Sequence, residues 1–282
     1  MTGPHLLVVH NADSDPVGRL GTWLTDAGAV LHIIDPPELP TDLRGFDGLV
    51  VLGGPMGAND DERAPWLPHE RELLREAVTA QLPTLGICLG AQLLAAANGG
   101  RVIANPDGPE VGAQLVAKRG AASSDPLFGP VPITPDVIQW HFDTITTLPP
   151  GAIHLASSPV CEFQAFRLGR LAWGVQFHIE TTPDVVRAWA AKDAHRLDRF
   201  DLERTVSRSD AVHDDLAEVW APFARTFVDI ARDPGSVTDP VGVRESVAGP
   251  VTDPAAIRAA LAAEANAART SLPMPGLRRQ DG

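Results

Sequence analysis

Residues 83–92 read Pro-Thr-Leu-Gly-Ile-Cys-Leu-Gly-Ala-Gln, and the fold can be worked out from this turn. An apolar run meets a helix-like run here, with Cys88 at the junction between Gly86 and Gly90. A sharp turn from strand to helix that carries a nucleophile needs small neighbours, because its backbone is tight. The helix that follows points free N–H groups at the sulfur and favours thiolate over thiol. Cys88 is therefore the best candidate for covalent chemistry, although a buried structural cysteine would show the same pattern.

Strand-like and helix-like segments alternate around this turn. The expected strands lie at 6–9, 30–34, 49–52 and 84–87, and the expected helices at 18–27, 69–80 and 90–98. The run at 49–52 is apolar at every position, as in a strand that is buried on both faces. The alternation predicts an α/β fold with a doubly wound, mostly parallel central sheet flanked by helices.

The pattern changes in the second half of the chain. Short strands are expected at 111–117, 137–140, 153–157, 162–168 and 172–177, followed by helices at 183–199 and 210–231. From residue 234 onward the sequence is rich in Pro, Gly and Ala. We therefore expect one domain at 1–233 and a largely flexible extension at 234–282, with a short helix at 255–268.

Composition excludes several classes of protein. Among 282 residues, 36 acidic and 23 basic side chains give a net charge of -13, which argues against a nucleic-acid or anionic-membrane partner. The two cysteines make no disulfide framework and lack metal-ligand spacing. No signal-length or membrane-spanning apolar run is present. We expect a cytoplasmic protein that uses no metal and no cofactor.

A histidine and a carboxylate stand close together near the end of the last expected strand. A thiol nucleophile needs a histidine partner, and the histidine needs an orienting acceptor. His178 and Glu180 would lie on one face, because residues two apart in a strand point to the same side. The carboxylate could then hold the imidazole in one tautomer and stabilise its charged form. An ordinary surface His–Glu pair is the alternative.

Acyl transfer also needs two N–H donors for the oxyanion. The backbone N–H of Leu89, directly after the cysteine, is the usual first donor in such a turn. The loop Gly-Gly-Pro at 53–55 follows a buried strand and lacks bulky side chains, so the N–H of Gly54 is the candidate second donor. A plain turn would show the same three residues.

Three motifs together resemble the class I, triad-type glutamine amidotransferase domain. They are Gly-Gly-Pro at 53–55, Gly-Ile-Cys-Leu-Gly-Ala-Gln at 86–92 and Gln-Phe-His-Ile-Glu at 176–180, and their order and spacing match. Stretches at 109–112, 139–143 and 148–158 are similar to stand-alone members that resemble the amidotransferase domain of GMP synthase. The resemblance runs from about residue 6 to about residue 231 and implies a flavodoxin-like architecture.

The resemblance implies a triad of Cys88, His178 and Glu180. Cys88 would attack the side-chain amide of glutamine through a γ-glutamyl thioester. His178 would protonate the departing ammonia and then activate water, while Glu180 orients the imidazole. Gly54 and Leu89 would form the oxyanion hole.

The resemblance also implies which residues form the glutamine pocket. Gln92 would contact the substrate, and His141, Phe142 and Asp143 would border it. Ile179 stands where the family usually has proline, and it preserves the spacing of the triad. Phe142 stands where many relatives have glycine, and its ring is expected to narrow or reshape the pocket.

The expected partners follow from the same reaction. The substrate is a small molecule, either glutamine or another γ-glutamyl compound. The chain has no ATP-binding glycine-rich loop, so an ammonia-accepting synthetase would be a separate protein chain. The main alternative is a γ-glutamyl peptidase or hydrolase with the same triad. An α/β-hydrolase is disfavoured, because its acid precedes the histidine by many residues.

Other candidate residues are interpreted as structural. The acidic run at 60–62 is expected to be solvated, and Cys161 to be a partly buried structural residue. His195 and His213 are expected on helix surfaces, and Glu110 either supports a loop or lines the pocket.

Overall fold

A computed structural model describes residues 3–237, and an eight-stranded sheet forms its centre. In spatial order the strands are β2 (Val30–Ile34), β1 (His5–Val9), β3 (Gly48–Val51), β4 (Thr84–Ile87), β12 (Ala172–Val175), β11 (Ala165–Leu168), β10 (Ile153–Ser157) and β7 (Ala117–Lys118). Pairing is parallel from β2 to β12 and antiparallel from β12 to β7.

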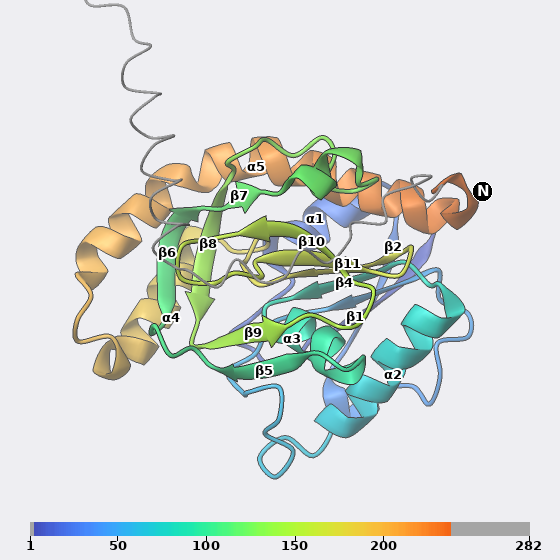
Figure 1. Ribbon diagram of the computed structural model, residues 1–282, viewed down its shortest axis with the longest axis horizontal. Coiled ribbons are helices and arrows are strands. Elements are labelled where there is room, and N and C mark those ends of the chain that lie inside the picture. The colour runs from blue at the N-terminus through green and yellow to red at the C-terminus, as the bar shows by residue number, and fades with distance from the viewer. Residues whose placement is uncertain (1–2, 238–282) are drawn as a thin grey trace, which may run out of the picture. The chain divides into compact units, whose positions relative to one another are not determined.

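Helices cover both faces of this sheet (Figure 1). One face packs against α1 (Gly18–Asp26) and α5 (Leu202–Arg232), and the other against α2 (Leu67–Ala80) and α3 (Leu89–Ala97). Strand β1 shows the reason: Leu6 and Val8 join the core on the α1 side, and Leu7 and Val9 join the core on the α2 side. The predicted doubly wound α/β fold is confirmed.

Two small antiparallel sheets stand beside the main one. Strand β5 (Arg101–Ala104) pairs with β9 (Asp143–Thr147), and β6 (Glu110–Leu115) pairs with β8 (Asp136–His141). The strands at 101–104 and 143–147 were not predicted, because each is short and pairs only with a distant segment. The turn between β8 and β9 lies at Phe142, which brings a predicted pocket residue to the end of both sheets.

The later helices differ in extent from the prediction. Helix α4 (Pro183–Asp193) ends early and continues as a 3-10 turn at Ala194–Arg196. Helix α5 begins at Leu202 rather than at 210, capped by Asp201, whose carboxylate accepts a hydrogen bond from the Arg204 N–H at 3.0 Å. The first turns of α5 are mostly polar, so their few apolar residues do not show a helical repeat in the sequence. Other 3-10 turns lie at Pro36–Glu38, Gly120–Ser124 and Pro234–Ser236.

The end of the described chain is attached to the main sheet. The Arg170 guanidinium donates to the backbone carbonyls of Pro234 at 2.8 Å and Val237 at 3.0 Å. The predicted domain boundary after residue 233 stays a prediction. The expected flexible extension beyond Val237, with its helix at 255–268, lies outside the described residues.

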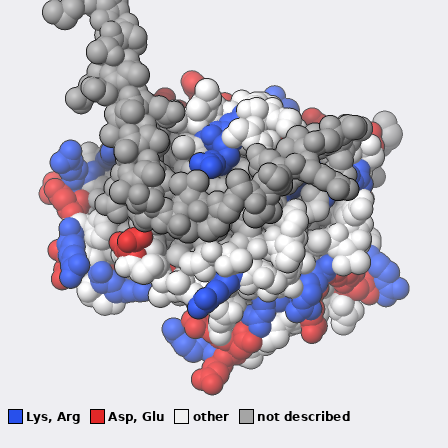
Figure 2. All heavy atoms as spheres, in the orientation of Figure 1, with Lys and Arg blue, Asp and Glu red and all other residues white. Residues whose placement is uncertain are grey.

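The surface carries charges of both signs. Figure 2 shows Lys and Arg side chains interspersed with Asp and Glu around the visible edges of this face. None of the helices within residues 3–237 is long and apolar enough to cross a membrane.

Candidate functional site

Four parallel strands deliver the site residues to one edge of the sheet. The loops that follow β1, β3, β4 and β12 carry Asp15, Gly54, Cys88 and His178. In parallel α/β sheets, ligands bind beyond the carboxyl ends of the strands. A cavity of about 520 Å³ lies at this edge, and Asp15, Gly54 and Cys88 line it.

Cys88 occupies a strained turn between β4 and α3. Its backbone angles are φ 50° and ψ −106°, which cost an ordinary side chain about 1–3 kcal/mol. Close packing forces the turn: a Cβ on Gly86 would lie 2.6 Å from the Gly90 carbonyl oxygen, and a Cβ on Gly90 would collide with the Val51 carbonyl. The Cys88 N–H donates to the Val175 carbonyl at 2.8 Å. The turn therefore holds Cys88 rigidly at the cavity.

His178 and Glu180 form a buried pair beside the same cavity. The imidazole Nδ1 lies 2.5 Å from Glu180 Oε1, and Glu180 Oε2 accepts the Ile179 N–H at 2.9 Å. Strand β12 ends two residues earlier than predicted, so a bridge to β8 positions His178 instead: its N–H donates to the Ile138 carbonyl at 2.8 Å. The Trp189 ring packs on the imidazole at 4.6 Å between centroids. We call Cys88, His178 and Glu180 the Cys88 triad.

The surroundings of His178 favour its charged form. Burial lowers the pKa of His178, but the Glu180 carboxylate and the Cys88 sulfur raise it, and the pKa lies well above its ordinary value. The second ring nitrogen, Nε2, is buried and has no hydrogen-bond partner among residues 3–237. An imidazolium next to the cysteine stabilises a thiolate, which is the nucleophilic form of the side chain.

Two glutamine side chains connect the pocket wall to the sulfur. The Gln92 amide donates to Gln176 Oε1 at 3.1 Å and to the Asp143 carbonyl at 3.4 Å. The Gln176 amide in turn points at Cys88 Sγ, 3.7 Å away. Gln92 lines the cavity, and its expected contact with the substrate stays a prediction. The sequence did not predict that Gln176 lies between Gln92 and the sulfur.

The three residues of the β8–β9 turn border the cavity in different ways. The His141 side chain points into the protein interior, where its Nδ1 contacts the Asp143 carbonyl at 2.8 Å. The Phe142 ring lies under the Arg196 guanidinium at 3.6 Å. Burial and the nearby Asp60 raise the pKa of Asp143. Phe142 and Arg196 together therefore form one side of the cavity mouth.

The two candidate oxyanion donors belong to segments that touch. A Cβ on Gly54 would lie 2.6 Å from Met56 Sδ and 3.0 Å from Leu89 Cδ2, so the loop after β3 packs directly against the start of α3. Leu89 opens α3, and its N–H is one of the amides that a first helical turn leaves unpaired. The loop after β3 and the start of α3 therefore lie together beside Cys88.

Several cavity residues were missed in the sequence. Asp15, Trp140, Trp189, Lys192 and Arg196 line the cavity without belonging to any of the recognised motifs. Trp189 was predicted only as part of the apolar side of a helix. Asp15 could have been found, because it is an acidic residue in a loop directly after a parallel strand.

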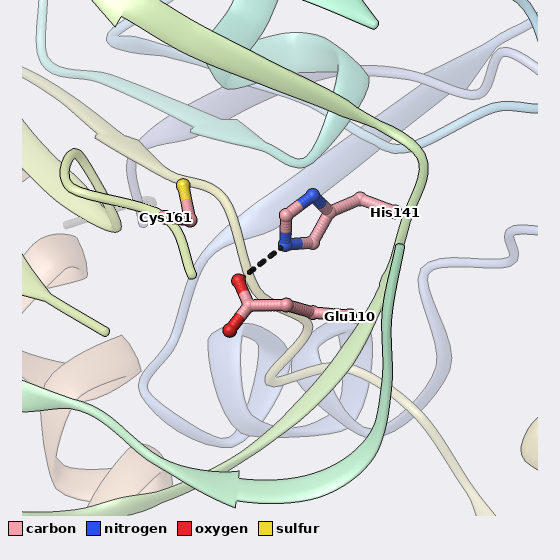
Figure 3. A group of neighbouring side chains, drawn as sticks. All are labelled: Glu110, His141 and Cys161. Atoms are coloured by element: carbon pink, nitrogen blue, oxygen red, sulfur yellow. Dashed lines mark hydrogen bonds and ion pairs between the residues drawn. The ribbon is translucent and has the colours of Figure 1, made fainter. Parts of the chain in front are cut away.

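A second buried group includes His141, the last residue of β8 (Figure 3). Glu110 accepts from Ser158 Oγ at 2.7 Å and from the Gln164 amide at 2.7 Å, and it contacts His141 Nε2 at 3.1 Å. The ligand atoms of Glu110, His141 and Cys161 lie within 4.8 Å of one another, a spacing that a metal ion could use. We call these five residues the Glu110 cluster.

The chemistry of the Glu110 cluster fits a structural network better than a metal site. Hydrogen bonds already engage both oxygens of Glu110 and both nitrogens of His141. Burial raises the pKa of Cys161 to about 12, so its sulfur is a thiol at neutral pH rather than the thiolate that binds metals. Of the two interpretations left open for Glu110, a structural role is the one this geometry favours.

One histidine differs from its predicted environment. His213 was expected on a helix surface and that prediction was wrong: it is buried, with Nδ1 2.6 Å from the Ser209 carbonyl and Nε2 3.2 Å from Thr181 Oγ1. Helix α5 turns this position toward α1 and the segment after β12. His195 is exposed, as predicted, but it lies in the 3-10 turn after α4 and lines the cavity.

Comparison with known proteins gives consistent findings. A family model described as glutamine amidotransferase class-I matches residues 25–192. A glutamine amidotransferase-like protein of Salmonella typhimurium is 32% identical over 64% of this chain and 76% of its own length. One of the subunits of the glutamine-hydrolysing GMP synthase of Natronomonas pharaonis is 36% identical over 56% of this chain and 78% of its own length.

A peptidase and a crystal structure extend the comparison. Gamma-glutamyl peptidase 3 of Arabidopsis thaliana is 29% identical over 51% of this chain and 59% of its own length. A glutamine amidotransferase crystal structure from Thermotoga maritima superposes with a TM-score of 0.71 and 27% identity, covering 83% of this chain and all of the other.

Proposed function

The chain belongs to the class I glutamine amidotransferase family, and we propose that it hydrolyses the side-chain amide of glutamine through a γ-glutamyl thioester on Cys88. One observation carries the proposal: a cysteine in a strained turn, at a cavity, beside a buried His–Glu pair. A strained backbone persists only where the surrounding structure over-determines it, and it clusters at active sites.

Acylation uses each member of the Cys88 triad. The Cys88 thiolate attacks the γ-carbonyl carbon, and the carbonyl π electrons move to oxygen. The N–H groups of Gly54 and Leu89 stabilise that oxyanion. His178 gives its Nε2 proton to the amide nitrogen, the C–N bond breaks, and ammonia leaves. Glu180 keeps Nδ1–H directed at its carboxylate throughout, so Nε2 is the nitrogen that exchanges the proton.

Deacylation reverses the proton transfer. Neutral His178 takes a proton from water, and the resulting hydroxide attacks the thioester carbonyl. The C–S bond breaks, glutamate leaves, and Cys88 is again a thiolate beside an imidazolium. The wall that holds the glutamyl half is formed by Gln92 and by His141, Phe142 and Asp143 at the β8–β9 turn.

The fate of ammonia is a separate part of the proposal. Several relatives are named as one of the subunits of GMP synthase, which implies that those proteins work with a second chain. We extend this to the present chain and assign the ammonia to a separate synthetase subunit. Copurification with a synthetase, and stimulation of glutamate release by it, is the corresponding test.

A γ-glutamyl peptidase activity is the second candidate function. The cavity extends past Cys88 to Lys192 and Arg196, so it has room for more than an amide nitrogen. A γ-glutamyl dipeptide presents the same glutamyl half to the pocket as glutamine does, and one relative is named a gamma-glutamyl peptidase.

A substrate panel tests both candidates. Glutamate release from glutamine and from γ-glutamyl dipeptides is measured with the wild-type protein and with Cys88→Ala. We expect the wild type to release glutamate and Cys88→Ala to be inactive. Preference for glutamine supports the first candidate, and preference for dipeptides supports the second. Equal rates in the wild type and Cys88→Ala would rule out both.

A further inference from the structure

Asp15 directs a carboxylate into the cavity from the loop between β1 and α1. The residue is 8% exposed and lines the cavity together with Cys88. Its Oδ2 accepts a hydrogen bond from Ser14 Oγ at 2.6 Å. Its Oδ1 accepts no hydrogen bond from any residue between 3 and 237. One oxygen of this buried carboxylate is therefore available to a ligand.

The free oxygen lies beside the catalytic imidazole. A Cβ placed on Gly53 would lie 2.9 Å from Asp15 Oδ1 and 3.2 Å from His178 Cε1, so both groups border the same small space. Cε1 is bonded to both ring nitrogens of His178, and Glu180 already engages Nδ1. The Asp15 carboxylate and the Cε1 edge of the ring, which adjoins Nε2, therefore both border the space beside Gly53.

The loop holds Asp15 in a fixed position. The Asp15 N–H donates to the Ala12 carbonyl at 2.9 Å, and the indole of Trp189 donates to the Ser14 carbonyl at 2.7 Å. The Arg19 N–H at the start of α1 donates to the Glu180 carbonyl at 2.8 Å. These contacts tie the loop to both sides of the imidazole, so Asp15 and His178 keep their relative placement.

The Asp15 residue is mostly buried but borders the cavity, and one of its two oxygens has no hydrogen-bond partner in the part of the chain that the structure describes. Burying a charged group is costly unless it is paired and hydrogen-bonded, and buried polar atoms of proteins are almost always satisfied. Burial indeed raises the pKa of Asp15, while His178, Ser14 and Lys192 lower it and Glu180 raises it. A ligand that brings N–H or O–H groups would supply the missing partner.

We propose that Asp15 is a catalytic residue that accepts an N–H of the leaving nitrogen during acylation and an O–H of the attacking water during deacylation. This inference rests on the proposed function, because it requires that Cys88 be acylated by a γ-glutamyl amide. It assigns Asp15 to the leaving group, a part of the substrate different from the glutamyl half assigned to Gln92 and the β8–β9 turn.

The proposed role of Asp15 follows from the charge and the hydrogens on the leaving nitrogen. When His178 Nε2 transfers its proton, the amide nitrogen of the tetrahedral intermediate gains positive charge and keeps its own hydrogens. Asp15 Oδ1 accepts one of these N–H groups and stabilises the charge as the C–N bond breaks. Water must then approach the same Nε2, so it takes the place that the amine has left and donates its second O–H to Asp15.

The proposal defines a substrate class. A primary or secondary amide leaves as ammonia or a primary amine and has an N–H for Asp15. An ester leaves as an alcohol whose single hydrogen comes from His178, so it has nothing to donate. Asp15 therefore favours amide over ester in the acylation step only.

The experiment compares these two leaving groups in a single turnover. Acylation of Cys88 by glutamine and by the γ-methyl ester of glutamate is followed by acid quench and mass spectrometry of the Cys88 peptide. The variants are Asp15→Asn and, as a matched control in the same loop, Asp13→Asn, which changes an exposed carboxylate outside the cavity. Thermal unfolding and alkylation of Cys88 by iodoacetamide report an intact fold and triad.

We expect Asp15→Asn to slow acylation by glutamine about 10²-fold, because a neutral amide oxygen stabilises the positive charge on the leaving nitrogen less than a carboxylate does. Acylation by the ester stays close to the wild-type rate. The adduct from either substrate decays more slowly, because the neutral amide oxygen of asparagine accepts the water O–H more weakly than the carboxylate does. Asp13→Asn matches the wild type in every step.

A second variant protects the test against a folding defect. Asp15→Ala leaves space for added formate, and recovery of amide acylation with formate supports the proposal. Equal slowing of amide and ester, or no slowing of either, overturns the role of Asp15 while the Cys88 adduct still upholds the proposed function. Absence of any adduct on wild-type Cys88 overturns the proposed function and this inference with it.

Discussion

Two regions of the molecule contain the same three kinds of side chain. The Cys88 triad and the Glu110 cluster each combine a cysteine, a histidine and a glutamate, and in both the His and Glu side chains are only 1% and 2% exposed. The carboxylate lies 2.5 Å from the imidazole in the first and 3.1 Å in the second. Composition and burial therefore do not distinguish the two regions.

The difference lies in which atoms remain free. In the Glu110 cluster, hydrogen bonds engage both carboxylate oxygens and both imidazole nitrogens. In the Cys88 triad, Nε2 of His178 has no partner within residues 3–237, and the cysteine sits in strained backbone at a cavity. In the Glu110 cluster the unpaired atom is instead the side-chain oxygen of Gln164, Oε1. An engaged His–Glu pair stabilises a fold, whereas an unpaired imidazole nitrogen beside a cysteine is available for chemistry.

Replacing each cysteine separately by alanine should give the largest difference in activity between the two regions. We expect Cys88→Ala to lower kcat for glutamate release by at least about 10⁴-fold, because the nucleophile is lost. Cys161→Ala should keep wild-type kcat and lose only packing. Steady-state kinetics and thermal unfolding of both variants measure the contrast. Similar activity in the two variants would contradict the assignment of the nucleophile.

The carboxylates give the next largest contrast in activity. Glu180→Gln keeps the size of the side chain but removes the charge that holds His178 in its tautomer, so kcat should fall about 10²–10⁴-fold. Glu110→Gln, its counterpart in the Glu110 cluster, should keep kcat within about tenfold, since it acts on the pocket wall only through His141. A larger loss of kcat in Glu110→Gln than in Glu180→Gln would break the comparison.

The pH dependence of these two variants follows from His178. The proposed acylation requires protonated His178, whose pKa lies well above the ordinary value, so activity should persist into alkaline pH and fall as pH rises through that pKa. His178 also contributes to the free energy of unfolding. This contribution is fully present below the pKa of an unfolded histidine, and it is lost as pH rises through the pKa of His178 in the folded protein. Glu180→Gln should move the alkaline limb of kcat to lower pH, and Glu110→Gln should leave it in place.

The free energy of unfolding should depend more on Glu110 than on Glu180, which is the reverse of the order expected for kcat. Glu110→Gln disturbs three hydrogen bonds at a fully buried carboxylate, and we expect it to lower the free energy of unfolding by about 3 kcal/mol. Glu180→Gln should cost less, because Glu180 accepts from fewer groups. Urea denaturation of both variants provides the values. Equal stability of wild type and Glu110→Gln would refute a structural role for the cluster.

The smallest effect concerns Phe142, which stands between the two regions. Its ring borders the cavity and supports the Arg196 guanidinium. Phe142→Gly should widen the mouth and change the ratio of kcat/KM for γ-glutamyl dipeptide over glutamine by about tenfold, with kcat on glutamine retained. An unchanged ratio would show that Phe142 does not set the choice of leaving group.

The central sheet and the turn at Cys88 could be predicted because their signals are local. Gly86 and Gly90 are required by contacts within the turn itself, and buried parallel strands read as continuous apolar runs. The two-residue spacing of His178 and Glu180 also predicts a pair on one side, even though a bridge to Ile138 rather than β12 positions them.

The remaining features depend on pairing between distant segments. Strand β5 exists only because it pairs with β9, some forty residues later in the chain. Glu110 meets Ser158 and Gln164 only after β6 and the segment following β10 come together. Asp15 becomes significant only because the fold places its carboxylate and the His178 ring at the same glycine, Gly53. No short sequence window contains these relationships.

Rapid acid quench followed by peptide mass spectrometry tests the central claim most directly. Wild-type protein is mixed with glutamine or a γ-glutamyl dipeptide. The masses of the peptides that contain Cys88 and Cys161 are measured at successive times while glutamate is being produced. We expect a transient gain of one glutamyl group on Cys88 and none on Cys161. Formation of glutamate with Cys88 unmodified at every time point, or an adduct on another residue, would contradict it.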